Sequence, residues 1–180
     1  FGATYKGKKS CNLSTIGSTS FFPSKPLGCY GDGGALFTND DDLVEKFRWI
    51  RVHGQSRKHH HPILGLNGRF DTIQAAILLV VLEVFSEEVK KRQKIGEHYS
   101  SRLAKGGLFG IPVVDAESTS VYAQYTIQSK NRSALQENLK GKSIPSVSYY
   151  TVPLHLQPVF TELGYLKGDF PVSENLADRC

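Results

Sequence analysis

Methionine is absent from all 180 residues, and the chain begins with Phe1. Because translation normally starts with methionine, we expect this chain to be part of a longer or processed protein. No apolar stretch approaches the roughly 20 residues that cross a bilayer, and no basic and apolar leader precedes the first residue. The 3 cysteines form no C-x-x-C pair, which fits a reducing cytoplasm better than a disulfide framework. The sequence therefore predicts a cytoplasmic protein with no membrane span.

Charge of one sign is not concentrated anywhere in the chain, although the net charge is +5. Small basic clusters occur at residues 6–9 and 90–94, and the second lies beside Glu87 and Glu88 on an expected helix. A nucleic-acid-binding module would show clustered basic and stacking aromatic side chains, which the sequence does not have. The positive charge is compatible with an anionic small substrate such as a nucleotide sugar.

The hydrophobic pattern predicts an α/β fold. Short strands are expected at residues 19–22 and 35–38, and a helix capped by Asn39 or Asp40 is expected over residues 42–52. A buried helix over residues 71–85 and a charged helix over 86–105 should follow. After two glycines, we expect strands at 121–128 and 144–150, a helix at 132–139, and a last helix that Ser173 caps. We divide the chain into residues 1–105, part of a large domain, and 106–180, a smaller α/β subdomain that is cut short.

Lys25 lies in a loop, residues 20–34, that is rich in glycine and proline and follows two phenylalanines. A lysine that bonds to a carbonyl compound must first lose its proton, which desolvation or a nearby cation favours. The hydroxyl groups of Ser18, Thr19 and Ser20 and the loop N–H groups could meet a phosphate. By itself such a lysine is most often a surface residue, and the loop lacks the G-x-x-x-x-G-K-[ST] order of a P-loop.

Residues 53–70 show no helical or strand periodicity, and long irregular segments are often functional. His53 could contact a ligand or cap the preceding helix. The three adjacent histidines at 59–61 cannot converge on one ion, so no metal site is expected. Asn67 and Arg69 could bind ligand groups, or they could be a turn residue and a surface cation paired with Asp71.

Five segments occur together in an order that resembles the DegT/DnrJ/EryC1/StrS family of sugar aminotransferases. They are residues 20–34, Thr-Asn-Asp at 38–40, Arg-Val-His-Gly at 51–54, Gly-Leu-Asn-Gly-Arg at 65–69 and Gln-Ala-Ala at 74–76. Residues that match the family's pattern are frequent from 1 to 103 and sparse from 106 to 145. It is strongest to the branch that aminates the 3-oxo group of UDP-2-acetamido-2-deoxy-3-oxo-glucuronate.

This resemblance implies part of a fold-type-I aminotransferase that uses pyridoxal 5′-phosphate (PLP). Lys25 would hold PLP and move protons, Ser20 would contact its phosphate, and the amino group would pass from an amino acid, glutamate, to a UDP-linked keto sugar. The product would enter polysaccharide or amino-sugar synthesis. The family implies a homodimer with shared active sites, in which Asn67 reaches the partner's PLP phosphate and Arg69 meets the substrate. We expect His53, in the same segment, to contact the substrate as well.

A late segment, residues 148–155, resembles the family's Y-x-P-L-H stretch, which borders the sugar pocket. It places Tyr149, Tyr150 and His155 as substrate contacts, although each is also compatible with packing at a strand end. Thr151 replaces the family's usual proline, and Tyr149 replaces a histidine that the similar branch often has. These differences leave the sugar open.

The family's D-x-A-Q motif, which supplies the acidic partner of the PLP ring nitrogen, has no counterpart in these 180 residues. We therefore expect this piece to be inactive alone and assign the reaction to its parent. The alternative is a non-catalytic relative that binds PLP or a sugar.

Overall fold

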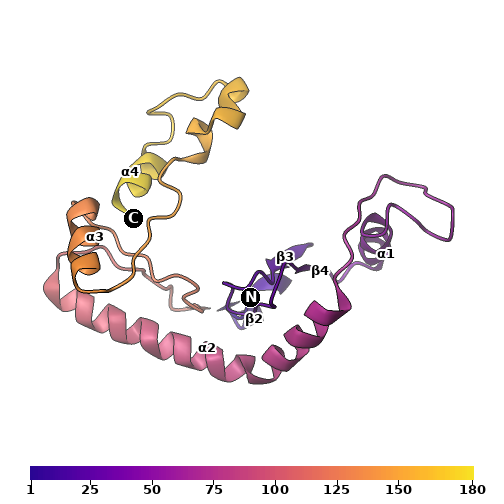
Figure 1. The fold of residues 1–180 in the computed structure, drawn as a ribbon, viewed down its shortest axis with the longest axis horizontal. Helices are drawn as coiled ribbons and strands as arrows, with labels where there is room; N and C mark the ends of the chain where they lie inside the picture. Colours follow the sequence, from indigo (N-terminus) through magenta and orange to yellow (C-terminus); the bar gives the residue numbers. More distant parts are fainter. The chain divides into compact units, whose positions relative to one another are not determined.

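The computed structural model describes residues 1–180 as two compact units. The first unit comprises residues 1–96 and 114–123, and the second comprises 97–113 and 124–180. Helix α2, Thr72–Gly106, contributes its first part to one unit and its last part to the other (Figure 1). By their contacts, residues 97–105 cluster with the second unit. The predicted domain boundary at residue 105 stays a prediction.

Two small antiparallel sheets lie in the first unit. In one sheet, β1 (Thr4–Tyr5) pairs with β2 (Lys8–Lys9) on one side and with β5 (Ser118–Thr119) on the other. The other is a hairpin of β3 (Gly17–Ser20) and β4 (Gly34–Phe37), registered from the Gly17–Phe37 pair to the Ser20–Gly34 pair. The two strands expected before and after Lys25 are thus present, each beginning one or two residues earlier.

Helix α1, Asp41–Ile50, begins where the capping chemistry predicts. The side chain of Asp40 accepts a hydrogen bond from the backbone N–H of Leu43 at 3.1 Å, which satisfies one free donor of the first turn. Two further aspartates in that turn place negative charge at the positive end of the helix dipole, which stabilises the helix. Of the two candidate caps, Asp40 is therefore the cap.

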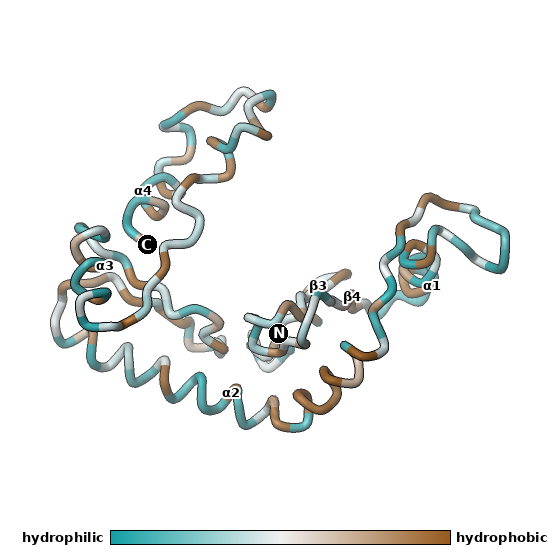
Figure 2. The backbone as a smooth tube through the Cα atoms, viewed as in Figure 1, coloured by the Kyte–Doolittle hydropathy of each residue, from teal (hydrophilic) through white to brown (hydrophobic).

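Helix α2 is continuous over 35 residues, so the prediction of two separate helices is wrong. Figure 2 shows why the sequence suggested two, because apolar residues fill the first part of α2 and polar residues the rest. A change in polarity does not break a helix, and no proline or glycine stands between Phe85 and Lys91 to end it.

The core of the first unit lies between α2 and the loop that carries Lys25. Its buried members are Phe21, Leu27, Cys29 and Phe85. Partly buried side chains pack around them, mostly from α2: Ala35, Phe70, Ile77, Leu78, Val81 and Val89. One face of residues 72–85 thus covers the base of the lysine loop. The prediction that this helix is buried all round is wrong for this chain, because Ile73, Leu79 and Val80 are 75%, 65% and 66% exposed.

The second unit contains short helices and no strands. Its elements are α3 (Arg132–Gly141), two 3₁₀ turns (Leu154–Leu156 and Pro158–Leu163) and α4 (Pro171–Arg179). The predicted strands at 121–128 and 144–150 are wrong for this chain. Gln128 exchanges backbone hydrogen bonds with Gly110, and Ile144 donates to Leu139 at the end of α3, so neither stretch has a neighbour along its length to form a ladder.

Helix α4 starts earlier than predicted. Pro171 occupies its first turn and Phe170 takes the N-cap position, so Ser173 lies inside the helix. Proline is well suited to this place, because the N–H that it lacks would have no partner there. The guanidinium of Arg132 donates to the carbonyl oxygens of Ala177 and Cys180, which ties the start of α3 to the end of α4.

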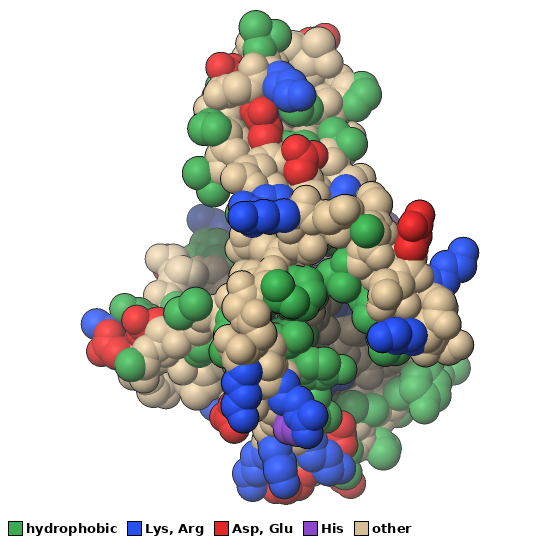
Figure 3. All heavy atoms as spheres, turned by 90° about the vertical axis from the view of Figure 1, so that its left-hand side faces the viewer, with side chains coloured by type: hydrophobic (Ala, Val, Ile, Leu, Met, Phe, Trp, Pro, Cys, Tyr) green, Lys and Arg blue, Asp and Glu red, His purple; other side chains and the backbone are tan.

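Basic and acidic side chains are mixed on the surface. Figure 3 shows Lys and Arg gathered with Asp and Glu among them. On α2, Lys90 binds Glu87 at 2.7 Å and Lys91 binds Glu88 at 3.1 Å, as expected for a solvated helix face. None of the helices has the combination of length and apolarity that crossing a membrane requires.

Candidate active site

The lysine loop, residues 20–34, joins β3 to β4 and is fixed at its base. Phe21 donates its backbone N–H to Gly33 and accepts one from Cys29, both at 2.8 Å. The side chains of Phe21, Leu27 and Cys29 are buried, whereas Lys25 at the tip of the loop is exposed. A further bond from the Lys25 N–H to the Phe22 carbonyl at 2.8 Å closes a turn. The loop thus holds the Lys25 backbone in one place and leaves its side chain accessible.

Close packing explains the glycines of this loop. A Cβ atom at Gly33 would lie 2.4 Å from Cε2 of Phe70, and one at Gly28 would lie 2.8 Å from the Phe22 carbonyl oxygen. At Gly31 a Cβ would meet Nε2 of Gln74 at 2.9 Å. A larger residue at Gly31 or Gly33 would push the loop away from Gln74 or Phe70, and one at Gly28 would press on the backbone of the loop itself.

Gln74 anchors the lysine loop to α2, and sequence analysis gave it no role. Its Oε1 accepts the backbone N–H of Tyr30 at 2.8 Å. It belongs to the Gln-Ala-Ala segment that the resemblance identified, but the sequence does not show which backbone group its amide would meet. The contact fixes the C-terminal half of the loop that begins at Ser20.

The surroundings of Lys25 suit an aldehyde cofactor that carries a phosphate. The Lys25 amine makes no ion pair and no side-chain hydrogen bond within the chain, so it is available for a covalent bond. The exposed Ser20 hydroxyl lies at the start of the same loop and accepts the N–H of Phe22 at 3.2 Å. An oxygen in that position can also donate its proton to a phosphate.

Residues 51–69 form a loop whose two ends run side by side and are joined by backbone hydrogen bonds. The N–H groups of His53, Leu66 and Gly68 donate to the carbonyls of Leu66, Ile50 and Arg51 at 2.8–2.9 Å. Val52 and Asn67 form an antiparallel bridge within this pairing. Cβ atoms at Gly54 or Gly65 would fall within 2 Å of the facing backbone, so only glycine permits the two arms to meet.

Arg69 and His53 meet at the open end of this segment. Nη1 of Arg69 lies 3.4 Å from Nε2 of His53, and Arg69 forms no ion pair with Asp71. His53 does not cap α1: its N–H donates to Leu66, its ring meets Arg69, and the C-cap of the helix is Arg51. The exposed Asn67 side chain has no hydrogen-bond partner within the chain, so its amide is available to a ligand.

The three adjacent histidines turn to different partners. Nδ1 of His60 lies 2.8 Å from the Ser56 hydroxyl, and Nδ1 of His61 donates to the His53 carbonyl at 2.9 Å. No group of three or more potential metal-ligating side chains occurs anywhere in residues 1–180.

The remaining predicted contacts belong to the second unit. Tyr149 and Tyr150 are exposed, with ring centres 6.0 Å apart, and Tyr150 adopts a left-handed backbone with φ of 59°. The His155 side chain is only 8% exposed, and its Nε2 lies 3.1 Å from Glu174. Its ring also packs on Phe170 at 4.7 Å, so the packing alternative describes its surroundings here. The sugar contacts of all three residues stay predictions.

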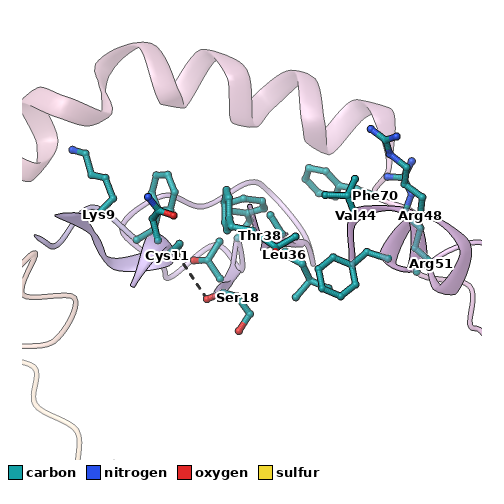
Figure 4. Close-up of a pocket in the computed structure, with 18 of the residues that line it drawn as sticks. Lys9, Cys11, Ser18, Leu36, Thr38, Val44, Arg48, Arg51 and Phe70 are labelled. Atoms are coloured by element: carbon teal, nitrogen blue, oxygen red, sulfur yellow. Dashed lines mark hydrogen bonds between the residues drawn. The ribbon is translucent and has the colours of Figure 1, made fainter. Parts of the chain in front are cut away.

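A cavity of the first unit lies beside the β3–β4 hairpin. It has a volume of about 1240 Å³, and its walls come from the β3–β4 hairpin, α1 and the start of α2 (Figure 4). Arg48 and Arg51 line one end and Lys9 the other, with Phe70 and Leu36 between them. Lys25, Ser20, Asn67 and Arg69 are not among its lining residues, whereas Phe21 and Gly34 of the lysine loop and the neighbouring Ser18 and Thr19 are.

Comparison with known proteins places the chain in a family. Residues 1–180 match the model of the DegT/DnrJ/EryC1/StrS aminotransferase family. The UDP-2-acetamido-2-deoxy-3-oxo-D-glucuronate aminotransferase of Pseudomonas aeruginosa is 51% identical over 179 residues, which are 99% of this chain and 49% of that protein. A "pleiotropic regulatory protein" of Geobacillus stearothermophilus is 46% identical, with the same shares covered.

Comparison with solved structures supports the same family. S. venezuelae DesV, solved in complex with a ketimine intermediate, superposes with a TM-score of 0.93 at 34% identity, over 99% of this chain and 48% of that one. The chain therefore spans about half the length of the relatives it matches, and its fold is part of their α/β aminotransferase fold. The family and the fold class predicted from sequence are both confirmed, and this chain belongs to the DegT/DnrJ/EryC1/StrS aminotransferase family.

Proposed function

We propose that the full-length protein transfers an amino group, with glutamate as the donor, to a keto group of a UDP-linked sugar. The observation that carries the proposal is Lys25, an exposed and unpaired amine on a loop whose backbone is fixed by Gln74 and by buried side chains. The P. aeruginosa relative, named for a 3-oxo-glucuronate substrate on UDP, supports the sugar class. Because the chain spans about half of that relative, the proposal concerns the longer protein, and we expect these 180 residues alone to be inactive.

The residues of the lysine loop fit PLP. Lys25 would bond to it through Nζ, and the Ser20 hydroxyl would hold its phosphate. When bound, PLP supplies an electron-accepting ring that eases proton removal from the carbon that carries the amino group. The amine of the amino donor would displace Lys25 from PLP, and the freed Nζ would take that proton and return it on the other side of the transfer, which requires a side chain that is held in place yet mobile at its end.

The second group of residues would bind the sugar nucleotide. Arg69 presents a planar fork that can pair with a carboxylate or a diphosphate, and Asn67 carries a free amide for the phosphate of a partner subunit's PLP. Tyr149, Tyr150 and His155 would border the sugar. We propose a homodimer with shared sites. We also propose that it is located in the cytoplasm, where the reducing conditions suit the three free cysteines.

Replacement of Lys25 tests the proposal. In the full-length protein, Lys25→Ala should lower amino transfer from glutamate to a UDP-linked 3-oxo sugar roughly 10²–10⁴-fold, because the covalent and proton-moving group is lost. Lys46→Ala removes another exposed lysine, on α1, and should leave the rate unchanged. Unchanged transfer by Lys25→Ala would disprove the assigned role.

The second candidate is a non-catalytic protein that binds PLP or a sugar. The G. stearothermophilus relative named as a regulatory protein favours it, at 46% identity. A wild-type full-length protein that binds UDP-sugars but transfers no amino group from any donor would select this candidate.

A further inference from the structure

His53 has a backbone conformation that a non-glycine residue rarely adopts. Its φ is 59°, in the left-handed region, and Gly54 follows with φ of 71°. Two bonds hold it there: its N–H donates to Leu66 at 2.9 Å, and its carbonyl accepts from His61 at 2.9 Å. Strained residues persist where the surrounding structure fixes them, and they concentrate at functional sites.

This conformation brings the His53 ring to the guanidinium of Arg69. The two side chains meet at 3.4 Å between Nε2 and Nη1. Arginine has only donors, so Nε2 must be the unprotonated acceptor and the proton of the neutral ring must lie on Nδ1. Protein geometry thus specifies one tautomer of His53 for this contact.

We propose that His53 is a positioning residue, which acts on the sugar nucleotide only by holding Arg69. The proposal rests on the proposed function, in which Arg69 binds an acidic group of the substrate. It replaces direct sugar contact as the role of His53, because Nε2 is directed at Arg69.

A neutral acceptor suits this purpose better than a carboxylate. Arg69 makes no ion pair in the chain, so its full positive charge stays available to an anionic ligand. An aspartate in the place of His53 would neutralise the guanidinium and compete with the substrate. Imidazole restricts the side-chain rotation of Arg69 without adding a negative charge, which lowers the entropy lost on binding.

The test uses calorimetric binding of UDP-glucuronate to the full-length protein, together with KM values for the keto sugar and glutamate. His53→Gly keeps the left-handed backbone but removes the acceptor, and His53→Gln returns an acceptor oxygen near the position of Nε2. We expect His53→Gly to weaken UDP-glucuronate binding and raise the sugar KM about three- to tenfold, with the glutamate KM unchanged. His53→Gln should recover most of the loss.

The Arg69→Ala variant distinguishes the positioning role of His53 from the substrate-binding role of Arg69. If it weakens UDP-glucuronate binding and His53→Gly adds nothing further in the double variant, the two residues act as one unit, as proposed. If Arg69→Ala weakens binding but the effects of the two variants add, or His53→Gly binds normally, the positioning role is overturned and the proposed function survives. If Arg69→Ala itself binds UDP-glucuronate normally, the role of Arg69 in the proposed function fails, and the inference fails with it.

Discussion

The carboxylate of Glu174 lies against two donors, the backbone N–H of Gly168 at 2.7 Å and Nε2 of His155 at 3.1 Å. The Gly168 N–H holds the pKa of this carboxyl below its ordinary value; burial opposes the shift, while His155 and the Phe170 N–H add to it. The folded chain therefore binds this proton more weakly than the unfolded chain does. The stabilisation is present above the ordinary glutamate pKa and is lost as pH falls through the lowered one.

Glu174→Gln tests this residue-scale linkage in the full-length protein. The wild type should unfold at a higher temperature than the variant near neutral pH, and the difference should shrink as the pH is lowered below the ordinary glutamate range. Circular dichroism melts at a series of pH values measure it. Glu162→Gln, an exposed glutamate without a hydrogen-bond partner, is the control. A difference that stays constant with pH would contradict the linkage.

The candidate residues of the site could be predicted individually, but most of their partners could not. Lys25, Asn67 and Arg69 are identified by motif, and the structure describes where they lie within the first unit. The anchoring of Tyr30 by Gln74 and the contact between His53 and Arg69 join residues 44 and 16 positions apart. Such contacts depend on the path of the whole chain, which periodicity and spacing do not specify.

At the scale of elements, helices were predicted better than strands. Helix α1 was predicted because Asp40 and its apolar spacing are local signals, and α3 begins at Arg132 as expected. The strands expected at 121–128 and 144–150 fail because a strand needs a hydrogen-bonding neighbour, which a local pattern cannot supply. The hairpin β3–β4 succeeds because its two strands are close in sequence and pair with each other.

The lysine loop and α2 work as one element. Phe70 and Gln74 fill the space that Gly33 and Gly31 leave, and Phe85 completes the core beneath. This packing explains why the loop motif and the Gln-Ala-Ala segment occur together in the sequence, because Gly31 of the loop leaves room for Gln74, and Gln74 in turn binds the loop backbone.

At the scale of the whole molecule, shared sites make a sharp prediction. If Lys25 of one subunit works with Asn67 and Arg69 of its partner, a mixed dimer of Lys25→Ala and Arg69→Ala subunits contains one intact site. Co-refolding the two full-length variants in equal amounts should therefore restore about a quarter of the wild-type rate at low sugar concentration. Each variant refolded alone is the control. No recovery in the mixture would place Lys25 and Arg69 in the same subunit.

The central claim is that Lys25 bonds to the cofactor, and the most direct measurement is reduction of the full-length protein with borohydride in the presence of PLP, followed by peptide mapping. The account predicts a stable pyridoxyl label on Lys25 and none in the Lys25→Ala variant. Label on a different lysine, or PLP that stays unattached, would contradict the account and leave the loop with a structural role.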